Sequence, residues 1–144
     1  MEKQKYPEPT VGALILNEEG KVLLVKSFKW EGYYTVPGGH VEVGETMEEA
    51  VKREVREEVG LEVEPIEFLR IQQAICPKEF YKEGHFIFLD FLCKTKNSNV
   101  KLDGKEIQEY IWVEPEKALK LNLETFTRNL IKKFLEKKEG IEWK

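Results

Sequence analysis

Three glutamates, Glu54, Glu57 and Glu58, lie within one and a half turns of a predicted helix in the segment 39–61. Side chains three and four positions apart share one face of an α-helix, so this spacing brings the three carboxylates together. Like charges at these offsets repel one another, and near the end of a helix they also oppose its dipole. A divalent cation offsets both costs, because Mg²⁺ and Mn²⁺ prefer clustered oxygen ligands. The spacing therefore indicates a metal site suited to phosphoryl chemistry, in which the metal neutralises a diphosphate and lowers the pKa of a bound water.

The flanking residues predict where the helix that carries these glutamates begins and ends. Thr46 followed three positions later by Glu49 is the pattern of a capping box, and Gly60 is the pattern of a C-terminal cap. A stripe of apolar residues spaced by four predicts the face that packs on a core. The residues of this stripe are Met47, Val51, Val55 and Val59.

The residues around the helix add to the predicted site. Pro37-Gly38-Gly39 forms a loop before the helix, and its bare backbone can approach a ligand closely. Arg53 is placed to hold a carboxylate by a bidentate contact. Glu45, just ahead of the predicted cap, is a candidate for a fourth carboxylate of the cluster.

The whole stretch resembles the Nudix box, the pattern Gly-x5-Glu-x7-Arg-Glu-U-x-Glu-Glu-x-Gly-U in which U is a bulky aliphatic residue. Every specified position is met within residues 39–61. The alternative is an acidic, solvated helix in a Glu-rich protein, and that alternative would match so many fixed positions only by a rare coincidence. The matching residues are Gly39, Glu45, Arg53, Glu54, Val55, Glu57, Glu58, Gly60 and Leu61.

The resemblance implies an enzyme that hydrolyses a nucleoside diphosphate linked to another moiety, by attack of water at phosphorus. It implies Mg²⁺ as cofactor, with Mn²⁺ as a substitute. Glu54, Glu57 and Glu58 would be metal ligands and catalytic residues, with Glu58 the first choice to bridge ions and Glu54 a candidate base. The Gly39 carbonyl would complete the metal shell, and Arg53 would orient a carboxylate.

Some members of the family take a further carboxylate from a loop outside the box. Glu106, which precedes the last predicted strand, is the candidate metal ligand here, with Glu109 behind it. An exposed glutamate in a Glu-rich chain is an equally compatible reading of either residue.

The substrate is less well defined than the chemistry. Pro77, sixteen residues after Leu61, resembles a feature of ADP-ribose pyrophosphatases of this family, whereas Tyr81, twenty residues after, resembles one of dinucleoside polyphosphate hydrolases. ADP-ribose or a similar ADP-linked compound is favoured. The alternatives are a dinucleoside polyphosphate and a nucleoside triphosphate, in the latter case as a pyrophosphatase that removes oxidised or canonical nucleotides. A non-catalytic nucleotide-binding module is disfavoured, because the box keeps all of its carboxylates.

Four side chains outside the box are candidates for binding the substrate. Trp30 and Tyr34 precede the Gly-Gly loop, where a base could stack on them. Tyr81 and His85 lie between two predicted strands, and the imidazole is a candidate phosphate contact. Packing of the aromatic residues at a sheet edge remains the structural alternative.

Composition limits the class of protein. With 144 residues and 41% hydrophobic content, the chain fits a single domain over residues 1–144, as a monomer or homodimer. A net charge of −4 argues against binding a nucleic-acid polymer, but not against a small nucleotide substrate held by a metal. The start of the chain lacks the apolar core of a signal peptide and no apolar run reaches membrane length, so a cytoplasmic protein is expected. Cys76 and Cys93 fit no metal or disulfide spacing, and buried reduced thiols are expected.

The remaining periodicities predict a layered domain of the α/β or α+β class with a mixed β-sheet and two main helices. The Nudix resemblance makes this more specific: an α/β fold of the Nudix type, an α/β/α sandwich with the mixed β-sheet between helices. Predicted strands cover residues 11–16, 22–25, 33–36, 66–75, 86–93 and 107–113, and predicted helices start at 46, 115 and 123.

Overall fold

A computed structural model describes residues 4–141, so both ends of the predicted domain lie outside the described residues. Every predicted strand and helix is present, with bounds shifted by a few residues. The strands are β1 (Glu8–Leu16), β2 (Val22–Ser27), β3 (Tyr34–Thr35), β4 (Gly38–His40), β5 (Glu64–Ile75), β6 (His85–Lys94) and β7 (Ile107–Val113). The helices are α1 (Met47–Val59), α2 (Pro115–Ala118) and α3 (Thr125–Ile141), with the 3-10 turn η1 (Phe28–Trp30) after β2.

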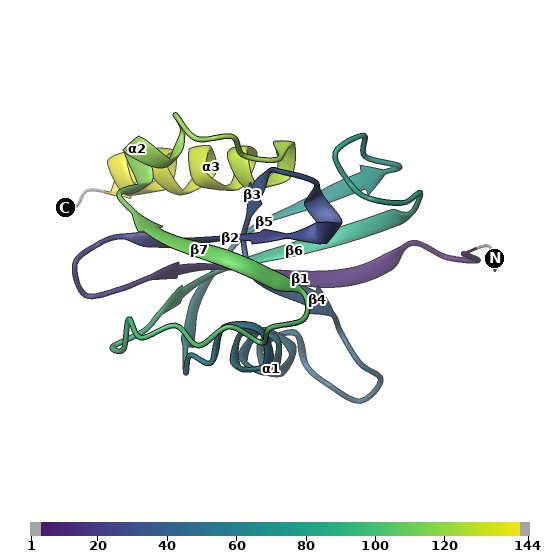
Figure 1. Ribbon diagram of the computed structural model, residues 1–144, viewed down its shortest axis with the longest axis horizontal. Coiled ribbons are helices and arrows are strands. Elements are labelled where there is room, and N and C mark those ends of the chain that lie inside the picture. Colours follow the sequence, from purple (N-terminus) through teal and green to yellow (C-terminus); the bar gives the residue numbers. More distant parts are fainter. Residues whose placement is uncertain (1–3, 142–144) are drawn as a thin grey trace.

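The strands form one mixed sheet between two layers of helix. The main order is β3-β2-β1-β6-β5, with β4 paired to β1 and β7 paired to β2. β1 and β6 run parallel, while the other pairs are antiparallel. Helix α1 covers one face of the sheet, and α2 and α3 cover the other (Figure 1). The predicted α/β/α sandwich is therefore confirmed.

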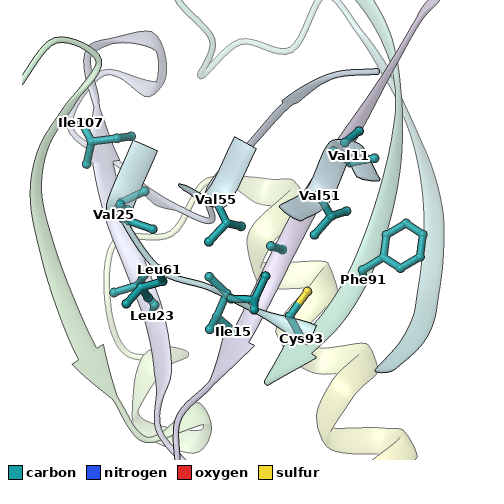
Figure 2. Packing of buried hydrophobic residues seen from close by; sticks show 14 residues of the cluster. Val11, Ile15, Leu23, Val25, Val51, Val55, Leu61, Phe91, Cys93 and Ile107 are labelled. Carbon is teal, nitrogen blue, oxygen red and sulfur yellow. The ribbon is translucent and has the colours of Figure 1, made fainter. Parts of the chain in front are cut away.

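Alternation along the strands supplies the core on each side of the sheet. On β1, Val11 and Ile15 face α1, whereas Leu14 faces α3, as expected when successive side chains point to opposite faces. On the first face, Val51 and Val55 of α1 are fully buried against the sheet (Figure 2). The core on the second face contains Leu14, Val22, Leu24, Leu69, Leu92, Ala118, Leu123, Leu130, Ile131 and Phe134.

The two central strands diverge beyond their hairpin, and this opening positions the site. β1 and β2 pair at Leu16 and Val22, and from there β1 takes β4 as its antiparallel neighbour while β2 takes β3 and β7. The segment from Tyr34 to His40 thus fills the space between the two strands. A cavity opens here, with residues of β1, β4, β6 and the start of α3 in its lining.

Two expectations about packing are wrong. Met47 does not belong to the buried stripe: it is 39% exposed, because it is the first residue of α1 and precedes the part of the helix that contacts the sheet. Cys76 is exposed and takes a positive φ of 46° just after β5, whereas Cys93 is buried as expected. Burial raises the pKa of the Cys93 thiol to about 12, so the thiol stays protonated.

No helix within residues 4–141 is long and apolar enough to cross a membrane.

Candidate active site

Helix α1 is fixed at both ends by the caps that the sequence predicts. The Thr46 hydroxyl accepts the Glu49 N–H at 3.1 Å, and the Glu49 carboxylate accepts the Thr46 N–H at 2.8 Å, which completes the capping box. Gly60 ends the helix in the left-handed conformation at φ 69°, where a side chain would be strained. With both ends fixed, the face of the helix that carries the glutamates is fixed as well.

Glu54 lies directly against the Gly38-Gly39 strand. A Cβ atom on Gly39 would collide with the Glu54 carboxyl group, so this approach requires glycine. Burial raises the pKa of Glu54, while the hydrogen bond and charge of Arg53 oppose the rise. The backbone of β4 and the first box carboxylate therefore form one surface.

Glu58 is the most buried of the box glutamates, with 6% of its surface exposed. Its carboxylate accepts the Gly38 N–H at 3.1 Å. Burial raises its pKa strongly, and the charges of Glu106 and Glu54 raise it further. Glu106, which stands just before β7, also pairs with the Lys29 ammonium at 2.7 Å. The structure thus brings a carboxylate from outside the box next to Glu58, at the position that the sequence offered as a candidate.

Arg53 donates hydrogen bonds to three carboxylates at once. Its guanidinium holds Glu45 by two hydrogen bonds, from Nε at 2.6 Å and from Nη2 at 3.0 Å. Nη1 donates to Glu54 at 3.0 Å and to Glu57 at 3.1 Å, and Nη2 also donates to the His40 carbonyl at 2.9 Å. The bidentate contact therefore goes to Glu45, whose pKa it lowers. Glu45 serves as the partner of Arg53 and does not extend the acidic cluster.

The donor set fits a hard divalent cation. Within residues 4–141, no three acidic, imidazole or thiol side chains are already arranged so that they could hold a metal ion as they stand. Burying Glu58 beside Glu54 and Glu106 is nonetheless costly unless positive charge compensates it. Carboxylate oxygens are the ligands that Mg²⁺ and Mn²⁺ prefer.

A cavity extends from Glu58 into the molecule. Glu58, Glu106 and Lys29 line it, together with the backbone of Gly38 and Gly39. It offers about 130 Å³, roughly ten times the space that one water molecule needs. Five aromatic side chains form much of its wall, which suits a flat ring system. These are Trp30, Phe80, Phe86, Phe88 and Phe126.

Two buried carboxylates in this cavity were missed by sequence reasoning. Glu124 is 2% exposed and accepts four hydrogen bonds: the hydroxyls of Thr35 and Thr127 each at 2.7 Å, and the backbone N–H groups of Phe126 at 2.6 Å and Thr127 at 2.9 Å. It caps the start of α3, and its donors satisfy both oxygens. Burial still raises the pKa of Glu124.

Asp90 is 4% exposed and accepts one side-chain hydrogen bond, from Gln72 Nε2 to its Oδ2 at 2.9 Å. Burial raises the pKa of Asp90 to about 7, against the hydrogen bond from Gln72, with Glu124 adding to the rise and Arg70 opposing it. The sequence does carry a signal for this residue. A single aspartate interrupts the apolar run 86–93, and such a residue is either exposed at an edge or buried for a reason.

Of the four side chains expected to bind substrate, only Trp30 lines the cavity. Tyr34 does not, because it packs against the core on the α3 side, with the Lys26 ammonium 4.7 Å from its ring centroid. Its part in substrate binding is therefore not supported by its position.

Tyr81 and His85 also lie outside the cavity lining. Tyr81 is 41% exposed and meets the ring of Phe28 edge-on at 5.5 Å. His85 exchanges backbone hydrogen bonds with the Gln4 side chain, and its Nε2 is buried without a partner among residues 4–141. Phe80, from the same loop as Tyr81, is the residue that reaches the cavity.

Comparison with known proteins gives consistent matches over nearly the whole chain. The family model described as NUDIX domain matches residues 6–134. The nucleoside triphosphatase NudI of Escherichia coli K12 is 32% identical over 133 residues, which cover 85% of this chain and 94% of that protein. The crystal structure of the MutT protein from Methanosarcina mazei Go1 is 28% identical with a TM-score of 0.75, covering 95% of this chain and 99% of that one. An Ap4A hydrolase from C. elegans is 25% identical with a TM-score of 0.76, covering 93% and 99%.

Proposed function

The chain belongs to the Nudix family of hydrolases, and from this premise we propose that it hydrolyses a nucleoside triphosphate between the α and β phosphates. The observation that carries the proposal is one continuous cavity, lined by Glu58 and Gly38 of the box region and by aromatic side chains. A nucleotide has the same two parts, because its phosphates suit a metal on carboxylates and its base suits an aromatic wall. The 32% identity to the nucleoside triphosphatase NudI supports the same substrate class.

The roles of the individual residues follow from this proposal. Nudix hydrolases generally need divalent metal ions, and a bound Mg²⁺ or Mn²⁺ would neutralise phosphate charge and lower the pKa of a bound water. Glu54, Glu57 and Glu58 would hold it, together with Glu106. Glu54 would accept the proton of the attacking water. Hydrolysis would release a nucleoside monophosphate and pyrophosphate.

Three further groups would assist the reaction without accepting the proton of the attacking water. Arg53 would keep Glu54 and Glu57 in position, since it already binds both carboxylates. The Gly39 carbonyl would add one oxygen to the metal shell. Lys29 lines the cavity beside Glu106 and would offset charge on the phosphates.

ADP-ribose, or a similar ADP-linked compound, is a second candidate that one observation favours. Phe28 and Tyr81 form an edge-on pair, 47% and 41% exposed, and the Tyr81 N–H donates to the Lys29 carbonyl at 2.8 Å. This pair offers a contact for a sugar beyond the diphosphate. Pro77 itself contributes a turn, since its carbonyl accepts the Phe80 N–H at 3.2 Å.

A substrate panel tests the proposal. The purified protein with Mg²⁺ is given nucleoside triphosphates including 8-oxo-dGTP, ADP-ribose, diadenosine polyphosphates, nucleotide sugars and NADH, each with and without EDTA. We expect the highest kcat/KM for a triphosphate and loss of turnover in EDTA. Equal turnover with EDTA would exclude the metal-dependent mechanism, and a higher kcat/KM for ADP-ribose would make the second candidate the function.

A pair of variants then separates the two candidates at the residue level. Tyr81→Ala is expected to change the ratio of kcat/KM between ADP-ribose and dGTP about five- to a hundredfold if the far group contacts this ring. Tyr110→Ala is the matched control, because Tyr110 is similarly exposed at 42% but lies on β7 outside the cavity. An unchanged ratio in both variants would remove the ground for ADP-ribose.

A further inference from the structure

We propose that Asp90 reads the nucleobase, so that the cavity selects a base with an exocyclic amino group and binds guanine best. This inference rests on the proposed nucleotide hydrolysis, and it names the substrate class of that same cavity. Four features carry it: an open carboxylate oxygen, a fixed side chain, a space kept free by glycine and an aromatic wall.

One oxygen of Asp90 is available to a ligand. The residue is 4% exposed and lines the cavity. Its Oδ2 accepts the Gln72 amide, while Oδ1 accepts no hydrogen bond from any side chain or backbone N–H in residues 4–141. Oδ1 is not one of the fully buried atoms without a partner in residues 4–141, so it is open to the cavity, where an N–H group of a bound molecule can reach it.

The direction of this oxygen is set by a chain of amides. Gln72 Nε2 donates both to Asp90 and to the Phe126 carbonyl, the latter at 3.0 Å, and Gln72 Oε1 accepts the Asn129 amide at 3.2 Å. Because both ends of the Gln72 amide are engaged, it presents N–H and not oxygen to Asp90. The aspartate is therefore held as an acceptor with its second oxygen facing the cavity.

Gly12 keeps the space around this oxygen free. Gly12 and Asp90 are direct partners in the parallel pairing of β1 and β6. A Cβ atom at position 12 would stand 2.8 Å from Asp90 Oδ1. The residue opposite the open oxygen is thus a glycine, and any other residue would place a Cβ atom against that oxygen.

Aromatic rings surround the place where a base would lie. Trp30, Phe88 and Phe126 contact one another, with ring centroids 6.4 Å apart for Trp30 and Phe88, 6.3 Å for Trp30 and Phe126, and 5.1 Å for Phe88 and Phe126. Such rings provide apolar contact for either face of a flat ligand. Glu124 also lines the cavity, but its four donors leave it no role as an acceptor for the base.

The chemistry of an open carboxylate favours particular bases. Above its pKa of about 7, Asp90 is ionised, and an ionised carboxylate only accepts hydrogen bonds, so it pairs with N–H groups and repels carbonyl oxygens. Guanine presents a ring N–H beside its amino group and can satisfy the acceptor twice. Cytosine and adenine offer an amino group next to a ring nitrogen that accepts, whereas uracil, thymine and hypoxanthine offer no amino group.

Two pairs of substrates that differ at the amino group test the proposal. GTP and ITP differ by that group alone, and CTP carries an amino group where UTP carries a carbonyl. For the wild-type protein with Mg²⁺, at a pH well above the Asp90 pKa of about 7, we expect kcat/KM to favour GTP over ITP and CTP over UTP by about 10- to 100-fold, as for a hydrogen bond to a charged group. Ratios near one for both pairs would overturn the proposal.

Asp90→Asn is the informative variant, because it keeps the shape of the side chain. The Gln72 N–H would pair with the new amide oxygen and leave an amino group facing the cavity, so the variant should favour UTP over CTP and lose its preference for GTP. Glu124→Gln is the matched control, a second buried carboxylate of the same cavity, and should leave both ratios unchanged. Unchanged ratios in Asp90→Asn would give Asp90 a purely structural role.

A binding measurement separates this proposal from the proposed reaction. Calorimetry with GMP and IMP, without metal, needs neither turnover nor a variant. Tighter binding of GMP by about tenfold or more, in a protein that hydrolyses none of the nucleotides, would support the role of Asp90 and refute the proposed function. Equal binding of GMP and IMP, together with hydrolysis of nucleoside triphosphates that favours neither GTP nor CTP, would support the proposed function and refute the role of Asp90.

Discussion

Two groups of carboxylates lie in or near the cavity, one on α1 and one on the α3 side of the sheet, and the protein stabilises them in different ways. Glu54 and Glu57 on α1 share one guanidinium, that of Arg53. On the α3 side, Glu124 is held by hydroxyl and backbone donors and Asp90 by an amide. In the first group several negative charges lie close together, and such a cluster of carboxylate oxygens suits a metal ion. The second group is held by neutral donors, which fix the direction of each carboxylate without supplying charge; Asp90 alone keeps an oxygen open for recognition.

The comparison also shows why burial alone does not define a role. Burial raises the pKa of Glu58, Asp90 and Glu124 alike. What distinguishes them is what lies next to each carboxylate: other acids for Glu58, four donors for Glu124, and one donor with an open side for Asp90. We expect changes in the first group to alter the rate for every substrate, a change at Asp90 to alter the choice of substrate, and a change at Glu124 to alter stability without changing that choice.

The largest expected effect is that of Glu58→Gln, which keeps the shape of the side chain and removes its charge. Because Glu58 would be a metal ligand, kcat should fall by several orders of magnitude, more than the roughly 10- to 100-fold typical of losing an outer partner of a metal site. Steady-state kinetics with Mg²⁺ measure the loss. Glu48→Gln, on the exposed first turn of the same helix, is the control. A loss below tenfold in Glu58→Gln would assign the ligand role to another residue.

The second prediction concerns stability and pH at Asp90. Its folded pKa of about 7 lies above the ordinary value of 3.8, so the folded protein binds the extra proton between these values. The free energy of unfolding therefore falls as pH rises from 3.8 to about 7, by on the order of 4 kcal/mol in total. Above pH 7 this group causes no further change. Asp90→Asn should be more stable than the wild-type protein above pH 7 and equally stable near pH 4, measured by urea unfolding across pH.

Asp103→Asn is the control of opposite sign. Burial raises the pKa of Asp103, but backbone hydrogen bonds from Lys105, Ile107 and Glu106 outweigh it and lower the pKa below 3.8. This carboxylate stabilises the fold above its ordinary pKa and loses that effect as pH falls. Its replacement should therefore destabilise the protein at neutral pH. The same sign of effect in both variants would contradict the assignment of Asp90 as an uncompensated buried acid.

The third prediction concerns Arg53, which orders the first group. Arg53→Ala should lower kcat by about 10- to 100-fold with little change in KM, because the guanidinium positions carboxylates and does not touch substrate. Arg53→Lys should not restore the rate, since an ammonium cannot make the bidentate contact to Glu45. Arg56→Ala is the control, because Arg56 also makes two hydrogen bonds to one carboxylate but to the exposed Glu62. A raised KM with unchanged kcat would instead place Arg53 on the substrate.

The two groups differ as much in how far the sequence predicts them. The helix of the first group lies within one short segment, so its period and the capping residues Thr46 and Gly60 fix which side chains share a face. One mixed sheet and two main helices also follow from periodicity, apart from errors such as Met47 and the exposed Cys76, whereas the faces that the helices cover came from the family resemblance. Local pattern is sufficient wherever the contacts are local.

The second group depends on contacts that no local pattern contains. Gly12 meets Asp90 through a parallel pairing of distant strands, Gln72 of β5 donates to Asp90, and the Phe126 carbonyl of α3 in turn accepts from Gln72. The order of residues in the sequence shows that aromatic residues precede the Gly-Gly loop. It does not show that Trp30 faces the cavity and Tyr34 the core. Facing direction is set by strand register, which depends on the fold as a whole.

The smallest expected effect, and the sharpest test of the comparison, is that of Gly12→Ala. No positive φ is required at Gly12, so alanine can adopt its backbone conformation, and the new methyl group meets only side chains: Asp90 Oδ1 at 2.8 Å and Val36 Cγ2 at 3.5 Å. The first distance is too short for contact, so the Asp90 carboxylate must turn away while the box on the other face of the sheet stays unchanged. We expect the ratio of kcat/KM for GTP over ITP to fall by about three- to tenfold, the range for weakening one hydrogen bond. Rates for ITP and inhibition by EDTA should remain as in the wild-type protein. An unchanged GTP preference in a stably folded Gly12→Ala protein would mean that the position of this oxygen does not govern the choice of base.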